Sequence, residues 1–265
     1  MIRAVVFCLV FLVIACKSPA PDNPLPYLYG EWAREDYLED LKKTKSPYKS
    51  SRLLNGVVYM YIDTTKPHTD SMEIGASWNN HEGYTFYLYP NKGTTNHSFL
   101  ISHPDYDDST SRYELAYVPG NKSRYLTLYH YNKSNAVIDS VRFVSVPANT
   151  ALEPLQYIVN DILIAGSYKC FDSLNRVTTV KFSSEGKISG VANYTDYLIA
   201  TDFNGGPERI DYIVLSSGNV RSTYTTYGLN FDDDTVRFYG TVEDTLTGGI
   251  SDSLGALRYT LVKER

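Results

Sequence analysis

Most of the chain alternates between apolar and polar residues with a period of two, which is typical of half-buried β-strands. The alternation begins after Leu53 and continues to Val146 in short segments, separated by turn residues such as Pro, Gly, Asn and Asp. Short strands joined in this way predict an antiparallel meander that closes into a barrel or a sandwich. The expected strands of this first series are 57–62, 71–78, 84–89, 96–102, 112–118, 125–131 and 137–146.

A second strand series begins at Ser167 and continues to Val262. It contains about eight strands, which is the natural number for a small closed barrel. Its expected strands are 167–171, 177–182, 188–194, 197–201, 210–215, 222–227, 235–240 and 257–262.

The segment from Trp32 to Lys43 has helical periodicity instead. Its acidic residues come first and its lysines last, an order that suits the helix macrodipole. Tyr37, Leu38 and Leu41 form an apolar stripe at helical spacing. This pattern predicts a short N-terminal helix that begins directly at Trp32.

A second helical segment, 150–165, separates the two strand series. Pro154 fits its first turn and Gly166 fits just beyond its end. Its apolar stripe consists of Leu155, Ile158, Val159, Ile162 and Leu163. We therefore predict an inter-domain helix here.

Together these patterns predict an all-β chain with two consecutive small antiparallel β-barrels. The expected divisions are a first barrel over 29–149, a linking helix over 150–165 and a second barrel over 166–265. We expect residues 166–265 to contain their own core and to fold alone. The alternative is one larger sheet shared by both halves, which would leave unpaired edges when cut.

The N-terminal segment carries a different signal. Arg3 is its one charge, and an apolar run from Ala4 to Ala15 follows, too short to span a bilayer as a permanent helix. The Leu-Val-Ile-Ala sequence before Cys16 resembles a bacterial lipobox. The resemblance implies a signal peptide over 1–15, lipid attachment at Cys16 and a proline-rich, lipidated tether over 16–28.

The tethered, β-rich chain looks like the uncharacterised envelope lipoproteins of Bacteroidetes-type bacteria. Lys17 follows the lipidated position, where an Asp is the usual inner-membrane retention signal of proteobacterial lipoproteins. The resemblance therefore implies a lipid-anchored protein of the bacterial outer membrane, on its periplasmic face. The alternative for residues 1–16 is an uncleaved anchor helix.

Composition narrows the classes of partner. The chain has 30 acidic and 25 basic residues, a net charge of −5, which excludes the electrostatic footprint of a nucleic-acid-binding protein. Its 24 tyrosines fit strand faces, and they also fit a ring platform for sugars or flat apolar ligands. Composition leaves both interpretations open.

Sequence motifs for catalysis are absent, including G-x-S-x-G, H-E-x-x-H, the Walker loop and C-x-x-C. The five histidines have no metal-ligand spacing, and Asp232, Asp233 and Asp234 lack the spacing of a calcium loop. Cys170 alternates within an expected strand and is interpreted as a small buried hydrophobe. We predict no catalytic residue, no metal ligand and no cofactor.

The second half resembles the lipocalin-like domains of secreted bacterial proteins. Gly166-Ser167-Tyr168, the strand 177–182 and the segment Glu185 to Gly190 carry this resemblance. In such domains a Gly-x-aromatic start leads into an up-and-down barrel with a basic residue on its last strand. The resemblance implies that Arg258 packs over Tyr168 at the closed end of the barrel. The first half has Gly30-Glu31-Trp32 but departs from the pattern, because a helix is expected where a lipocalin has its first strand.

These observations favour a membrane-tethered, non-enzymatic binding lipoprotein that holds a small apolar or amphipathic ligand. The first alternative is a structural or assembly component of an envelope complex. The second is a hydrolase or isomerase on a calycin-like barrel. An open apolar interior favours the binding protein, and a filled barrel with an exposed aromatic patch favours the assembly component. Carboxylates or histidines clustered inside a cavity favour the enzyme.

Overall fold

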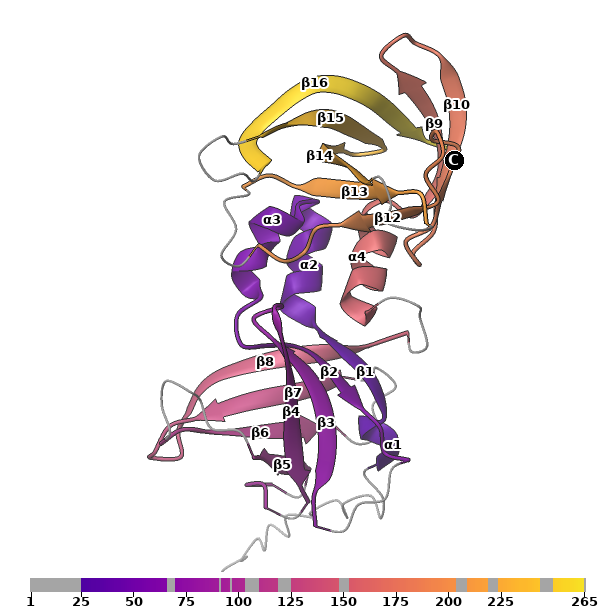
Figure 1. Ribbon diagram of the computed structural model, residues 1–265. Coiled ribbons are helices and arrows are strands. Elements are labelled where there is room, and N and C mark those ends of the chain that lie inside the picture. The colour runs from indigo at the N-terminus through magenta and orange to yellow at the C-terminus, as the bar shows by residue number, and fades with distance from the viewer. Residues whose placement is uncertain are drawn as a thin grey trace, which may run out of the picture.

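The protein consists of two β-barrels with a layer of helices between them (Figure 1). This computed structural model describes residues 25–65, 70–90, 92–95, 97–102, 110–118, 125–147, 153–203, 209–218, 224–243 and 250–264. The predicted signal peptide, Cys16 and the tether up to residue 24 lie outside the described residues. The predicted fold class, all-β with two consecutive lipocalin-like barrels, is confirmed.

The first barrel is a closed, eight-stranded antiparallel meander in which the first strand also pairs with the last. Inward-facing positions recur at every second residue, as the alternation predicted, and their side chains fill the interior. Trp32, Met60, Phe86 and Phe143 are among the fully buried ones. The strands are β1 (Gly30–Arg34), β2 (Val57–Ile62), β3 (Met72–Trp78), β4 (Glu82–Tyr89), β5 (Ser98–Ile101), β6 (Arg112–Tyr117), β7 (Tyr125–Tyr131) and β8 (Val137–Val146).

The second barrel repeats the same up-and-down order, with its first strand paired to its last. The two edge strands of this sheet meet at one isolated bridge between Lys187 and Asp196, which nearly closes the barrel. The strands are β9 (Gly166–Asp172), β10 (Val177–Phe182), β11 (Ile188–Ser189), β12 (Asp196–Ile199), β13 (Tyr212–Ser216), β14 (Tyr224–Asp232), β15 (Thr235–Glu243) and β16 (Ile250–Lys263).

Strand β11 is much shorter than the predicted 188–194. Gly190 and Ala192 have φ angles of 90° and 43°, in the left-handed region, so the chain leaves the extended conformation after Ser189. A β-carbon at Gly190 would lie 2.0 Å from the carbonyl oxygen of Thr179, so this turn requires glycine. The residues after β11 therefore form a loop at one end of the barrel instead of completing the strand.

The predicted helix from Trp32 is wrong at its start. Trp32 belongs to β1, where it pairs with both β2 and β8, and the helix begins only at Glu35. The indole ring is fully buried in the first barrel, and its Nε1 donates a hydrogen bond to the carbonyl oxygen of Leu28 at 2.8 Å. The first barrel thus does have its first strand directly after the Gly-x-aromatic start. The helices are α1 (Leu25–Leu28), α2 (Glu35–Thr44), α3 (Pro47–Ser50), the 3₁₀ turn η1 (Ser51–Leu53) and α4 (Pro154–Leu163).

The core of the second barrel continues into the helical layer. A single cluster of buried apolar side chains joins the barrel interior to α2, through Tyr37 and Leu41, and to α4, through Leu155 and Val159. The first barrel has a separate cluster of its own. Residues 166–265 therefore have a core inside their barrel, as expected, but residues of α2 and α4 extend and cover it. Whether this segment folds alone stays a prediction.

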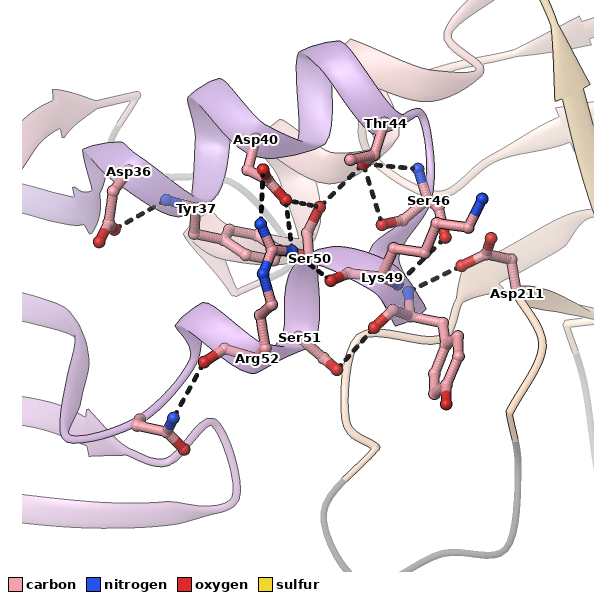
Figure 2. Close-up of polar contacts among 12 residues, drawn as sticks. Asp36, Tyr37, Asp40, Thr44, Ser46, Lys49, Ser50, Ser51, Arg52 and Asp211 are labelled. Carbon is pink, nitrogen blue, oxygen red and sulfur yellow. Dashed lines mark hydrogen bonds and ion pairs between the residues drawn. The ribbon is translucent and has the colours of Figure 1, made fainter.

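Polar contacts also join the two halves. The backbone nitrogen of Tyr48 donates to Oδ1 of Asp211 at 2.7 Å, and Nδ2 of Asn160 donates to the carbonyl oxygen of Ser184 at 3.1 Å. Figure 2 shows Asp211 reaching from the second barrel to the start of α3. All of these contacts are at the closed end of the second barrel, the end where Gly166 follows α4.

The Asp211 contact gives a testable stability prediction. Burial raises the pKa of this carboxyl despite the hydrogen bonds that it accepts from Ser46 and Tyr48. We expect Asp211→Ala to lower the free energy of unfolding by about 1–3 kcal/mol, because the Tyr48 N–H loses its acceptor. Asp211→Asn keeps an acceptor and removes a buried charge, so it should be neutral or stabilising at neutral pH.

The pH dependence follows from the raised pKa. Between the unfolded and folded pKa values the folded state binds more protons, so this group stabilises the protein as the pH falls. In urea melts, the wild type should gain stability relative to Asp211→Asn when the pH is lowered from about 7 to about 4. A constant difference between the two proteins across this range would contradict the prediction.

Candidate functional site

The second barrel is open at the end opposite to α4. There, ten described residues of β9, β14, β15, β16 and the turn after β9 surround a hollow of about 470 Å³. A second hollow of about 320 Å³ adjoins it and shares Asp172, Arg176 and Tyr259 with the first. We refer to the two hollows together as the mouth. The first hollow is lined by Asp172, Ser173, Arg176, Thr225, Thr226, Tyr227, Gly240, Thr241, Arg258 and Tyr259.

Arg258 lies in this mouth and not over Tyr168, so the pair expected from the resemblance is wrong. The register of β16 against β9 places Lys263 opposite Tyr168, with the Lys263 Nζ 6.0 Å from the centre of the tyrosine ring. Arg258 comes earlier on β16, beside Tyr259, which pairs with Asp172 at the other end of β9. Tyr168 itself is buried at the closed end, as expected, and burial raises its pKa to about 12.

A register shift and a glycine bring Arg258 into the mouth. Phe238 pairs with Tyr259 and Tyr239 pairs with Leu257, so Arg258 is an extra residue in a β-bulge. A β-carbon on Gly240 would lie 3.4 Å from the Nε of Arg258, which shows that the guanidinium occupies the space above this glycine. Within the described residues this guanidinium has no ion-pair or hydrogen-bond partner.

Aromatic rings form the floor of the mouth. The ring centres of Tyr227 and Tyr259 are 5.7 Å apart, and Phe238 lies 5.9 Å and 6.3 Å from them. Burial is the main cause that raises the pKa of Tyr227, and the neighbouring Tyr259 and Tyr194 raise it further. Its hydroxyl therefore stays neutral at physiological pH. Below these rings the barrel is filled with apolar side chains, which makes the mouth shallow.

The other charged residues of the mouth neutralise each other. The Nε of Arg176 lies 2.6 Å from Oδ2 of Asp172. Partial burial would raise the pKa of Asp172, but hydrogen bonds from Arg176 and from the Leu174 backbone outweigh it and hold the pKa below its usual range. Asp172 is therefore ionised and paired, and among the described residues of the mouth Arg258 is left as the uncompensated charge.

The second hollow is lined by smaller and more apolar groups. Cys170, Thr178, Val191 and Ala192 surround it, together with Gly190 and the shared residues. Cys170 is buried, as predicted, and burial raises its thiol pKa to about 11. The thiol is thus neutral near pH 7 and acts here as a small apolar surface.

The first barrel has its hollow on the outside. A groove of about 530 Å³ lies on β2, β3 and β4 and is lined by Tyr59, Tyr61 and Tyr84. Gly75 keeps it open beside Tyr61, with which it pairs, because it has no side chain. Burial raises the pKa of Tyr59, and the carboxylates of Glu31 and Glu153 raise it further. This groove is the aromatic surface that the tyrosine content led us to consider.

The histidines are not gathered into a site. Nδ1 of His81 lies 2.7 Å from Oδ2 of Asp202, while His97 and His130 pack against tyrosine rings. His68 and His103 lie outside the described residues. Within the described part of the chain, no group of three or more metal-ligating side chains is close enough to hold a metal ion.

Comparisons with known proteins add no relative: neither a family model, nor a curated protein, nor a solved structure matches this chain. Its class rests on the fold, which is that of a tandem lipocalin-like barrel protein. Of the helices in the described ranges, none has both the length and the hydrophobicity that crossing a membrane requires.

Proposed function

We propose that this protein is a non-enzymatic binding lipoprotein whose second barrel holds one small amphipathic ligand at its mouth. The observation that carries the proposal is the pair of adjoining hollows, one polar and lined by Arg258, the other lined by small, mostly apolar groups. Ligand sites in small barrels are concave and combine apolar surface with a few oriented polar groups. The two hollows together offer both, with the polar groups concentrated in the first hollow.

The proposal includes the tether. Cys16 would carry the lipid, and residues 17–24 would hold the barrels away from an outer membrane, on its periplasmic side. The last four residues of the expected tether, 25–28, form α1 instead, and Leu28 packs into the core of the first barrel. Two or more acyl chains give stable membrane binding, because each buried methylene contributes about 0.8 kcal/mol. The mouth opens at the end of the second barrel opposite to the helical layer, so the first barrel leaves it accessible.

A hydrolase or isomerase is supported less well. Among the described lining residues Asp172 is the one carboxylate, and its ion pair with Arg176 occupies it. Burial keeps both Tyr227 and Cys170 protonated, so neither side chain supplies a base near neutral pH.

The test is calorimetric titration with three ten-carbon amphiphiles that differ only in their head group: decanoate, decanol and decylamine. At least one should bind with a stoichiometry of one. Gly240→Phe should abolish that binding, because its ring fills the space above residue 240. Gly83→Ala is the matched control, since a β-carbon there meets nothing within 4 Å and the residue is in the first barrel.

Failure of all three amphiphiles to bind the wild type would contradict the proposed function. Unchanged binding in Gly240→Phe would place the ligand elsewhere and contradict the proposed site. Thermal melts of each variant establish that the barrel remains folded.

The second candidate function is an assembly component of the envelope. The groove of the first barrel, lined by Tyr59, Tyr61 and Tyr84, favours it. Tyr29 and Tyr87 are also exposed on that barrel. A protein of this kind would leave the second barrel's mouth without a small-molecule ligand, so the same titration separates the two candidates.

A further inference from the structure

We infer that the ligand of the second barrel carries a single negative charge on its head group, as a carboxylate does, and that Arg258 binds it. This inference rests on the proposed function and specifies the chemical class of ligand. It follows from the charges, the shape and the hydrogen-bonding groups of the mouth.

The charge of the mouth is the first step. Among the lining residues that the structure describes, three are ionised, and two of them, Asp172 and Arg176, form an ion pair with each other. Arg258 has no such partner among the described residues and is solvent-exposed. One unpaired guanidinium matches one negative charge, and its planar fork suits the two oxygens of a carboxylate.

The way in which Arg258 is held is the second step. Its side chain lies over Gly240, and the bulge in β16 directs it into the mouth together with Tyr259. A guanidinium on a bulge above a glycine is already positioned before the ligand arrives, so binding costs less side-chain entropy than on a freely moving arginine. β-Bulges are typical places where a strand redirects a functional side chain.

The position of the ligand's apolar part is the third step. Tyr259 borders both hollows, so a ligand whose charged end meets Arg258 can extend across this ring. Beyond it lie Cys170, Val191 and Ala192, which offer the ligand surface without charge. The two hollows thus match the two ends of an anionic amphiphile.

The experiment compares decanoate with decanol on wild-type protein and on three variants. On the wild type, decanoate should bind about tenfold or more tightly than decanol, because it adds a charge-assisted bidentate contact. Arg258→Gln should lower the affinity for decanoate to that for decanol and leave decanol unchanged. Arg258→Lys keeps the charge and should retain most of the preference.

Arg237→Gln is the matched control, because it removes an equal charge from the same barrel. Arg237 is paired with Asp232 at 3.0 Å near the closed end, away from the mouth. It should keep the preference for decanoate. Thermal melts of the Arg258→Gln and Arg258→Lys proteins, compared with the wild type, establish that both variants remain folded.

Three outcomes overturn the inference. If decanol binds the wild type as tightly as decanoate, the proposed function stands but the ligand's charge is irrelevant. If Arg237→Gln loses the preference as fully as Arg258→Gln, the effect belongs to the net charge and not to the mouth. If neither amphiphile binds, the proposed function fails together with the inference.

Discussion

A fragment of residues 166–265 is expected to be far less stable than the same barrel in the whole chain. Removing the first half exposes the apolar side chains that Tyr37, Leu41, Leu155 and Val159 cover. Each buried side chain of this size contributes about 1.5–3 kcal/mol. Together they amount to a large part of the 5–15 kcal/mol of stability that a typical domain has. We expect the fragment to aggregate or to melt without cooperativity.

Circular dichroism during a urea titration measures this loss. A longer fragment, 153–265, is the informative control because it restores α4 and hence Leu155, Val159 and Leu163 to the cluster. It should recover part of the stability, and the whole chain should recover the rest through α2. Equal midpoints for the fragment of residues 166–265 and the whole chain would show that the helical layer contributes nothing to this core.

Replacement of Cys16 by alanine is expected to move the protein from the membrane fraction to the supernatant. The proposed lipid is attached through the Cys16 thiol, and alanine has no sulfur to acylate. Even a single acyl chain gives only marginal membrane binding, and the Cys16→Ala protein would have no acyl chain. Nearly all of it should therefore leave the membrane fraction.

Fractionation of cells that express each form, followed by immunoblotting, measures the distribution. Cys170→Ala is the matched control, because it removes the buried thiol of β9 and leaves the proposed anchor intact. It should remain with the membranes. Retention of the Cys16→Ala protein in the membrane fraction would show that the chain is held there by something other than the lipid.

The strand pattern was sufficient to predict both barrels because alternation reports directly on which residues face inward. Trp32 shows where that reasoning failed. The acidic and lysine-rich order of 35–45 is a helical signal, and we extended it back to Trp32. Burial of the indole and pairing of β1 on both sides decided the outcome. Such pairing involves residues distant in the sequence, which local periodicity does not report.

The candidate site was harder to predict than the fold. Arg258 was singled out from its place on the last strand, but its role was assigned to the wrong end of the barrel. The position of a side chain on β16 depends on the bulge beside Tyr259, and a single extra residue changes which face it takes. No local sequence signal marks that bulge, although Gly240 on the neighbouring strand was a clue that something large lies above it.

Two buried carboxylates, Glu114 on β6 and Asp211 in the loop before β13, were missed entirely. Glu114 accepts hydrogen bonds from the backbone and side chain of Thr94 and from Ser98, and so ties the segment before β5 to β6. Asp211 has a similar role at the start of α3. Each of these carboxylates reads in the sequence as an ordinary surface residue, because its partners come from other parts of the chain.

The closure of the second barrel by β16 has a consequence for how the protein is made. Strand β9 leaves the ribosome early in the second half, yet one of its two partners is β16, which is made about eighty residues later. The remaining strands can pair with their neighbours in order of synthesis, but the sheet stays an open ribbon until β16 has been made. The first barrel and α2 have by then emerged and offer the surface on which that ribbon closes. A premature stop before β16 would therefore cost the protein an entire barrel and not merely one strand.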